Sequence, residues 1–124
     1  MASMGKALYS ACLLGQVREV RRLLSGGADF NHVNEQGHTP LMAASANGHL
    51  EVVDMVLSAE ANVTAADDEG STALHMASGF GHLVIVQRLL ASGADFNAVD
   101  NVGCTSLMIA SQNGHVEVVD MLLA

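Results

Sequence analysis

The stretch GHTPLMAASANGHLEVVDMVL at residues 37–57 returns, with changes, as GSTALHMASGFGHLVIVQRLL at residues 70–90 and GCTSLMIASQNGHVEVVDMLL at residues 103–123. Each copy begins 33 residues after the previous one, and residues 34–58 compared with residues 100–124 give 15 identities in 25. Such matching at a constant interval indicates tandem structural repeats, each of which buries its apolar side against its neighbours. We therefore treat residues 1–124 as a single domain of four repeats: 1–33, 34–66, 67–99 and 100–124.

Each repeat predicts the same pair of helices. Thr39, Thr72 and Thr105 precede runs of small and apolar residues, as helix N-caps do, and Pro40 suits the first turn of a helix. The Gly-His pairs at 48–49, 81–82 and 114–115 predict the end of that helix and a tight reversal. A second helix follows, with a buried stripe that in the second repeat comprises Val52, Val53, Val56 and Leu57. A Gly- and Asp/Asn-rich loop such as GADFNAVDNVGCT at 93–105 then leads into the next repeat.

The pattern G-x-T-P-L-x-x-A…G-H-x-E-V-V…L-L…G-A-D-x-N resembles the ankyrin repeat and covers nearly the whole chain. In the second repeat the matching residues are Gly37, Thr39, Pro40, Leu41, Ala44, Gly48, His49, Glu51, Val52, Val53 and Leu57. The resemblance implies an all-α solenoid of helix–turn–helix units joined by hairpin-like loops. It also implies a function in protein–protein interaction.

Departures from the repeat pattern are modest. The pattern's proline becomes Ala73 and Ser106, and its Gly, Asn and Glu become Glu60, Thr64 and Val84. We expect Glu60 to weaken a left-handed helix cap by up to about 1 kcal/mol, because glycine is the residue that adopts this conformation freely. The first repeat has Gly15-Gln16 for the Gly-His pair and Lys6 for the threonine, a divergence expected of a capping unit.

Charge and composition exclude several classes of partner. Five basic and thirteen acidic residues give a net charge of −8, which repels phosphate backbones, so we expect no nucleic acid. The one basic cluster, Arg18, Arg21 and Arg22, is interpreted as a solvated helix face. No apolar run approaches the roughly 20 residues that span a bilayer, and MASMGK lacks the apolar region of a signal peptide, so we expect no membrane segment. Two lone cysteines suggest a reducing compartment, the cytosol or nucleus.

The histidines and cysteines do not form a recognisable reactive site. His49, His82 and His115 occupy equivalent places in successive repeats, roughly 10 Å apart, too far to share one metal ion. By analogy with the family, we expect each ring to bridge backbone groups at the reversal, His75 to act similarly, and His32 and His38 to be solvated. Cys12 is predicted to be a packed, inert thiol and Cys104 an exposed one. We therefore predict no metal, no cofactor and no enzymatic activity.

Positions that the repeat does not fix are the candidates for partner contact. They lie before the first helix and near its end, and the resemblance implies that they line a concave groove. The candidates are Glu35, Gln36, His38, Asn47, Asp68, Glu69, Ser71, Phe80, Asn101, Val102, Gln112 and Asn113. Phe80 stands where the neighbouring repeats have Asn47 and Asn113, so it is a candidate anchor, with local packing over a turn as the alternative. The acidic residues around it favour a partner with a basic or amphipathic segment, although acidity also serves solubility.

The last repeat predicts an apolar end face, since no polar unit follows Leu122 and Leu123 in the sequence. Three explanations account for such an apolar end face: excision from a longer array, a frayed end, or self-association. We expect the chain to be a monomer. The function expected is protein–protein interaction through the hairpin tips and the inner-helix face. The alternatives are a structural or self-associating segment of a longer array, or a regulatory module of a larger protein.

Overall fold

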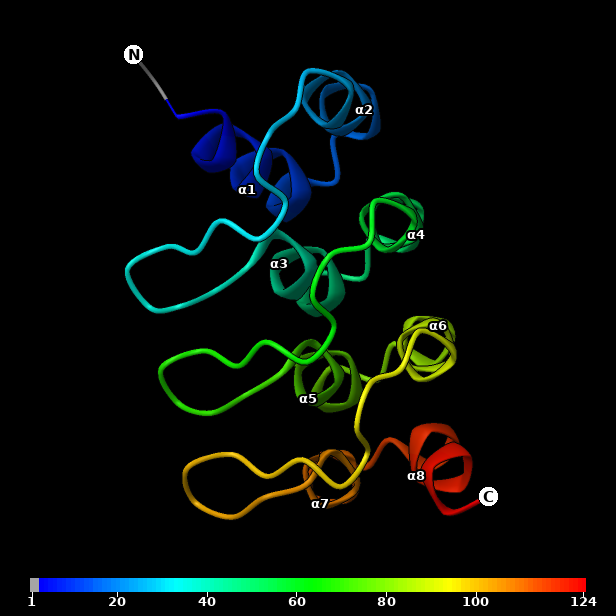
Figure 1. Cartoon of the computed structure of the whole chain (residues 1–124). Coiled ribbons are helices and arrows are strands. Elements are labelled where there is room, and N and C mark those ends of the chain that lie inside the picture. The colour runs from blue at the N-terminus through cyan, green and yellow to red at the C-terminus, as the bar shows by residue number, and fades with distance from the viewer. Residues whose placement is uncertain (1–2) are drawn as a thin grey trace.

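The computed structural model describes residues 3–124, and this part of the chain is a stack of eight α-helices (Figure 1). The helices are α1 (Met4–Leu14), α2 (Val17–Ser25), α3 (Pro40–Ala46), α4 (Leu50–Ser58), α5 (Ala73–Gly79), α6 (Leu83–Ala91), α7 (Ser106–Gln112) and α8 (Val116–Leu123). Pairing of strands within these residues is limited to one isolated bridge between Ala66 and Thr72. The predicted all-α solenoid is therefore confirmed.

The helices form two columns (Figure 1). Helices α1, α3, α5 and α7 make the inner column, α2, α4, α6 and α8 make the outer column, and the long loops project beside the inner one. Helices α3, α5 and α7 begin at Pro40, Ala73 and Ser106, which preserves the 33-residue interval. The exact boundaries of the four repeats and the assignment of residues 1–124 to a single domain stay predictions. None of the helices in residues 3–124 is long and apolar enough to cross a membrane.

The inner helices begin where the threonines predict. The hydroxyl oxygens of Thr39, Thr72 and Thr105 accept hydrogen bonds from the backbone N–H of the third residue of their helices, at 3.1, 3.3 and 3.3 Å. The first unit differs, because Ser3 caps α1 by accepting from the Lys6 N–H at 3.4 Å. Helix α1 therefore starts before Lys6 and has 11 residues, against seven in α3.

The reversal after each inner helix depends on a glycine and on a histidine from the next unit. Gly15, Gly48, Gly81 and Gly114 have φ between 72° and 76°, a conformation that glycine adopts without steric cost. The Nε2 atoms of His49, His82 and His115 lie 3.1, 3.1 and 2.9 Å from the carbonyl oxygens of Leu13, Ala46 and Gly79. Because a carbonyl only accepts, each Nε2 carries the proton and donates. The bridging role predicted for these three histidines is confirmed.

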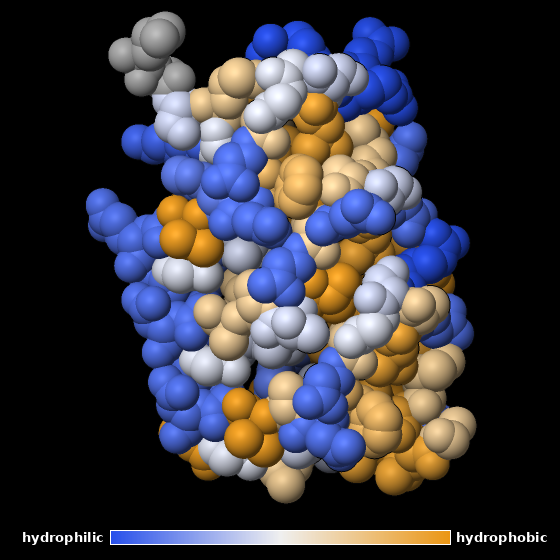
Figure 2. All heavy atoms as spheres, viewed as in Figure 1, coloured by the Kyte–Doolittle hydropathy of each residue, from blue (hydrophilic) through white to orange (hydrophobic). Residues whose placement is uncertain are grey.

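The core runs along the stack between the two columns and consists of aliphatic side chains. Its largest fully buried members include Leu8, Leu41, Leu74, Val53 and Val86. In the predicted stripe of the second repeat, Val52, Val53 and Val56 are buried, whereas Leu57 is only half-buried. On the face seen in Figure 2, hydrophilic atoms predominate over the loops, and apolar atoms gather over the helices, most densely at the end that holds α8. The loop side therefore offers the polar surface of the stack.

Candidate partner-binding site

Each hairpin tip is held by one side chain that accepts two backbone hydrogen bonds. The Oδ1 atoms of Asn34, Asp67 and Asp100 accept, at 2.9–3.0 Å, from the N–H groups two and four residues further along the chain. The bond from the Cys104 N–H is the largest of the influences that hold the pKa of the Asp100 carboxyl below its usual value. These three side chains serve the fold of the tips through their Oδ1 atoms.

Neighbouring tips are hydrogen-bonded to one another. The Asp68 N–H donates to the Gln36 carbonyl at 3.0 Å, and the Asn101 N–H donates to the Glu69 carbonyl at 2.9 Å. The Asn101 side-chain amide adds a bond to the Asp68 carbonyl at 2.9 Å. The candidates Gln36, Asp68, Glu69 and Asn101 thus lie in one continuous row, with their side chains exposed. A row fixed by its backbone can present these side chains without first ordering a loop.

His38 is not the solvated loop residue that we expected. It is half-buried, and its Nε2 lies 3.1 Å from Asp67 Oδ2, a carboxylate oxygen of the next hairpin. Ser71, another candidate, is also half-buried, and its backbone N–H and carbonyl both bond to Asp67. His38 therefore connects two successive tips, whereas Ser71 closes its own hairpin. His32 was also expected to be solvated, but it is half-buried, and its ring packs over Gly5.

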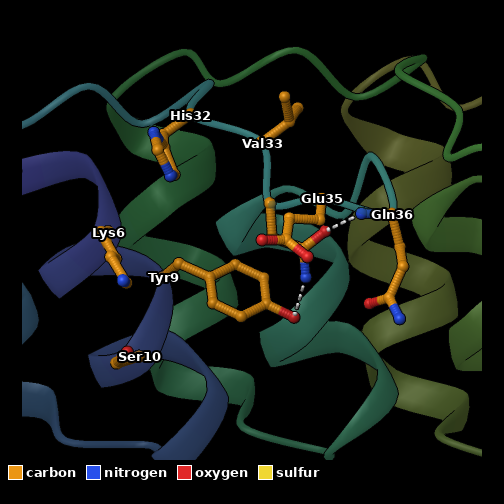
Figure 3. A pocket seen from close by; sticks show the side chains of 8 residues that line it. Lys6, Tyr9, Ser10, His32, Val33, Glu35 and Gln36 are labelled. Atoms are coloured by element: carbon orange, nitrogen blue, oxygen red, sulfur yellow. Dashed lines mark hydrogen bonds between the residues drawn. The ribbon is translucent and has the colours of Figure 1, made fainter.

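A pocket of about 620 Å³ lies between α1 and the first hairpin. It is lined by Lys6, Tyr9, Ser10, His32, Val33, Asn34, Glu35 and Gln36. In Figure 3, Tyr9 extends from α1 toward the loop that carries Glu35 and Gln36. The Tyr9 hydroxyl accepts from the Asn34 side-chain amide at 3.2 Å, and burial raises the pKa of this phenol.

A second pocket, of about 330 Å³, continues along the inner helices. Its lining consists of Tyr9, Leu13, His38, Met42, Ala43, Ala46, Asn47, Met76 and Phe80. Because Tyr9 lines both pockets, the two adjoin and make one groove across α1, α3 and α5, which we call the inner groove. Apolar side chains make up most of the second pocket, while the hairpin side of the groove carries polar groups.

Phe80 stands at the edge of the inner groove with 63% of its surface exposed. Its ring stacks on the His82 ring, with centroids 6.3 Å apart and planes inclined by 27°. The asparagines at the equivalent place behave differently. The side-chain amides of Asn47 and Asn113 donate to the carbonyls of Ala43 and Gly79, at 2.8 and 2.9 Å. Phe80 therefore replaces a structural hydrogen bond by a large exposed apolar ring.

The structure does not bring all the candidates together. Five of them line the inner groove: Glu35, Gln36, His38, Asn47 and Phe80. Val102 is exposed at the third tip, and Gln112 and Asn113 lie at the end of α7, outside both pockets.

Several groove residues were missed, above all Tyr9, Met42 and Met76. A signal was present for two of them, because one place in the repeat holds Tyr9, Met42, His75 and Met108, four residues of unlike shape and polarity.

The remaining reactive groups of the described part of the chain are engaged in the fold. Cys12 is fully buried, and burial raises the pKa of its thiol to about 12. Cys104 is half-buried rather than exposed as expected. His75 accepts from the Thr72 N–H through Nδ1 at 3.1 Å, and its Nε2 donates to the Cys104 carbonyl at 3.0 Å. Within residues 3–124, no three His, Cys, Asp or Glu side chains are grouped so as to hold a metal ion.

Comparison with known proteins adds one finding. Residues 3–67 and 61–124 match the family described as "Ankyrin repeats (3 copies)". No match was found among curated proteins.

Proposed function

Since the chain belongs to the ankyrin repeat family, we propose that it binds a partner protein along the inner groove and the hairpin tips. Ankyrin repeats are generally protein–protein interaction modules, and the family is typically not enzymatic. One observation supports this proposal most directly: the two adjoining pockets form a groove with Phe80 exposed at its edge.

The lining of the groove supports a ligand with large apolar side chains. Tyr9, Met42 and Met76 offer a floor of one aromatic ring and two flexible thioethers, which adapt well to an inserted side chain. Phe80 is already held against His82, so little conformational freedom is lost when a partner covers it. Aromatic residues beside apolar pockets are among the few residues that contribute most of the binding energy of an interface.

The acidic rim of the groove favours a ligand that carries basic residues next to its apolar ones. Glu35, Asp68 and Glu69 are exposed on the tips, and among the described residues no hydrogen bond or ion pair engages their side-chain oxygens. Rim charges mainly set the association rate and the choice of partner. The proposed ligand is therefore an amphipathic segment with apolar residues for the pocket and Lys or Arg for the tips.

Selection from a library of displayed 16-residue peptides tests this proposal. Enriched peptides should combine a large apolar residue with nearby Lys or Arg, and their affinity should be measured by titration. Phe80→Ala and Tyr9→Ala should each weaken binding about 10- to 100-fold, the cost of losing an aromatic anchor. Asp68→Lys should slow association more than it speeds dissociation.

Phe96→Ala is the matched control, because Phe96 has 53% of its surface exposed and lies outside both pockets. If Phe80→Ala and Tyr9→Ala bind selected peptides as tightly as Phe96→Ala does, the groove is not the binding site. A library that yields no binding peptide would favour a structural segment of a longer array. Two further proposals concern the setting of the chain: that it is a regulatory module of a larger protein, and that it works in the cytosol or nucleus.

A further inference from the structure

The three contacts between successive units follow one scheme. A histidine ring of the later unit covers the left-handed glycine of the earlier one and donates to a carbonyl there, as His82 does over Gly48. On the outer column, the contact between the second and third units has in addition an ion pair between Arg88 of α6 and Asp54 of α4. Each contact thus has a receiving half on the earlier unit and an inserting half on the later one.

The α7–α8 face repeats the receiving half. Gly114 has φ 75°, like Gly48, yet a Cβ built on it would meet nothing within 4 Å. Asp120 stands 66 residues after Asp54, at the same place in the repeat. Apolar side chains are also uncovered on this face. Met108 is 50% exposed whereas its equivalent Met42 is 1% exposed.

Two further pairs of residues at equivalent places in the repeat show the same difference in burial. Leu107 is half-buried whereas Leu74 is buried, and Val119 is half-buried whereas Val86 is buried. These side chains are covered in the inner units by the unit that follows. The α7–α8 face therefore has the shape and chemistry of a surface that receives another unit.

The α1–α2 face carries the elements of an inserting half. Arg22 stands 66 residues before Arg88, at the same place in the repeat, and its side chain is 69% exposed. Gln16 takes the place of the bridging histidine, and its side-chain amide can donate to a carbonyl as the imidazole does. Leu14, in the place of Asn113, offers an exposed apolar side chain.

The charges of the two faces are opposite. Arg18 and Arg22 are exposed on α2, and Asp120 is exposed on α8. Arg22 pairs with Glu19 of its own helix, an exposed contact that contributes little and is readily exchanged. Face-to-face pairing of two α7–α8 faces would instead bring the Asp120 carboxylates of the two copies toward each other.

We infer that a second copy of this chain stacks head to tail, with its α1–α2 face on the α7–α8 face of the first. In this arrangement Arg22 of one copy meets Asp120 of the next, as Arg88 meets Asp54 inside the stack. The contact joins two different surfaces, so a pair of copies keeps one free face of each kind and additional copies can join. It leaves the inner groove of each copy open and does not depend on the proposed function.

Light scattering across a range of concentrations tests the inference on the 124-residue chain. The average mass should rise continuously with concentration, and this rise should weaken in high salt. Arg22→Asp alone and Asp120→Arg alone should each weaken association at least about fivefold, because each creates a like-charge contact. An equal mixture of the two variants should restore association, since every contact between unlike copies then joins opposite charges.

Glu69→Arg is the control, because it makes the same change on an exposed tip far from both faces. Circular dichroism establishes that each variant is folded. A wild-type chain that stays monomeric at every concentration would overturn the inference. So would a dimer that stops growing, or a mixture of variants that associates no better than its components.

Discussion

At the scale of single residues, Glu60 occupies a conformation that suits glycine. Its φ is 68°, and it is the one non-glycine residue with positive φ in the described part of the chain. Gly27 and Gly93 hold the equivalent places, with φ of 87° and 100°. The expectation that Glu60 stands in a left-handed cap is confirmed, and the side chain there costs free energy because its Cβ crowds the carbonyl.

Glu60→Gly should therefore raise the free energy of unfolding by about 0.5–1 kcal/mol. The relief of backbone strain exceeds the added entropy of glycine in the unfolded chain. Urea denaturation followed by circular dichroism measures the change. Glu60→Ala keeps the strain and should change stability by less than about 0.5 kcal/mol, so equal gains from both variants would refute the strain explanation.

Cys12 should make stability fall in alkaline solution. Burial raises the pKa of its thiol from an ordinary value of 9.0 to about 12. Above pH 9 the thiol ionises in the unfolded chain but stays protonated in the folded one, so ionisation favours unfolding. Between pH 9 and 12 this group should remove up to about 1.4 kcal/mol per pH unit.

The comparison with Cys12→Ala isolates that contribution. The variant loses some packing at every pH, but its stability should decline less steeply above pH 9 than that of the wild type. Parallel declines, measured by urea denaturation at pH 8, 9 and 10, would show that the folded protein tolerates the thiolate.

At the scale of helices and turns, the glycine after each inner helix meets two demands that can be separated. Gly48 and Gly114 share the left-handed conformation, with φ of 74° and 75°. A Cβ at Gly48 would lie 2.8 Å from the His82 ring, whereas one at Gly114 would meet nothing within 4 Å. Conformation explains both glycines, but only Gly48 also makes room for the next unit.

Gly114→Ala should cost about 1 kcal/mol, the strain of a left-handed alanine. Gly48→Ala should cost about 2–4 kcal/mol, because it must also displace the ring that donates to the Ala46 carbonyl. Denaturation of both variants in dilute solution gives the difference. Equal losses would mean that the His82 contact adds nothing to stability.

The same scale shows what sequence reasoning can and cannot reach. Thr39, Thr72 and Thr105 predicted the starts of three helices, since capping is a local interaction between neighbours in the chain. The start of α1 at Met4 was missed, because Ser3 lies outside the repeat pattern.

Nonlocal features were harder to predict. Tyr9 could not be placed beside Asn34, because their contact depends on how the first hairpin lies over α1. The pairing of His38 with Asp67 likewise depends on the distance between two tips. Five residues of the inner groove were thus predictable from variation between repeats, while its apolar floor required the packed helices.

At the scale of the whole molecule, the stack is covered unequally along its length. Within residues 3–124, an inner unit packs against a unit on each side, so its stability includes two interfaces, whereas the α7–α8 unit packs against the α5–α6 unit on one side. Leu74 and Leu107 occupy the same place in their repeats, but Leu74 is 1% exposed and Leu107 is half-buried. Replacing leucine by alanine at each of these two positions therefore shows how the cost of the same substitution depends on burial.

Leu74→Ala should lower the free energy of unfolding by about 3–4 kcal/mol, the usual cost of a cavity in a packed core. Leu107→Ala should cost about 1–2 kcal/mol, because less apolar surface leaves water there on folding. Hydrogen exchange of the wild type in dilute solution should show the amides of α7 and α8 opening before those of α3 to α6. If Leu107→Ala were as costly as Leu74→Ala and exchange were uniform, the units would unfold together, and the α7–α8 face would not be the weakly covered end that these burials indicate.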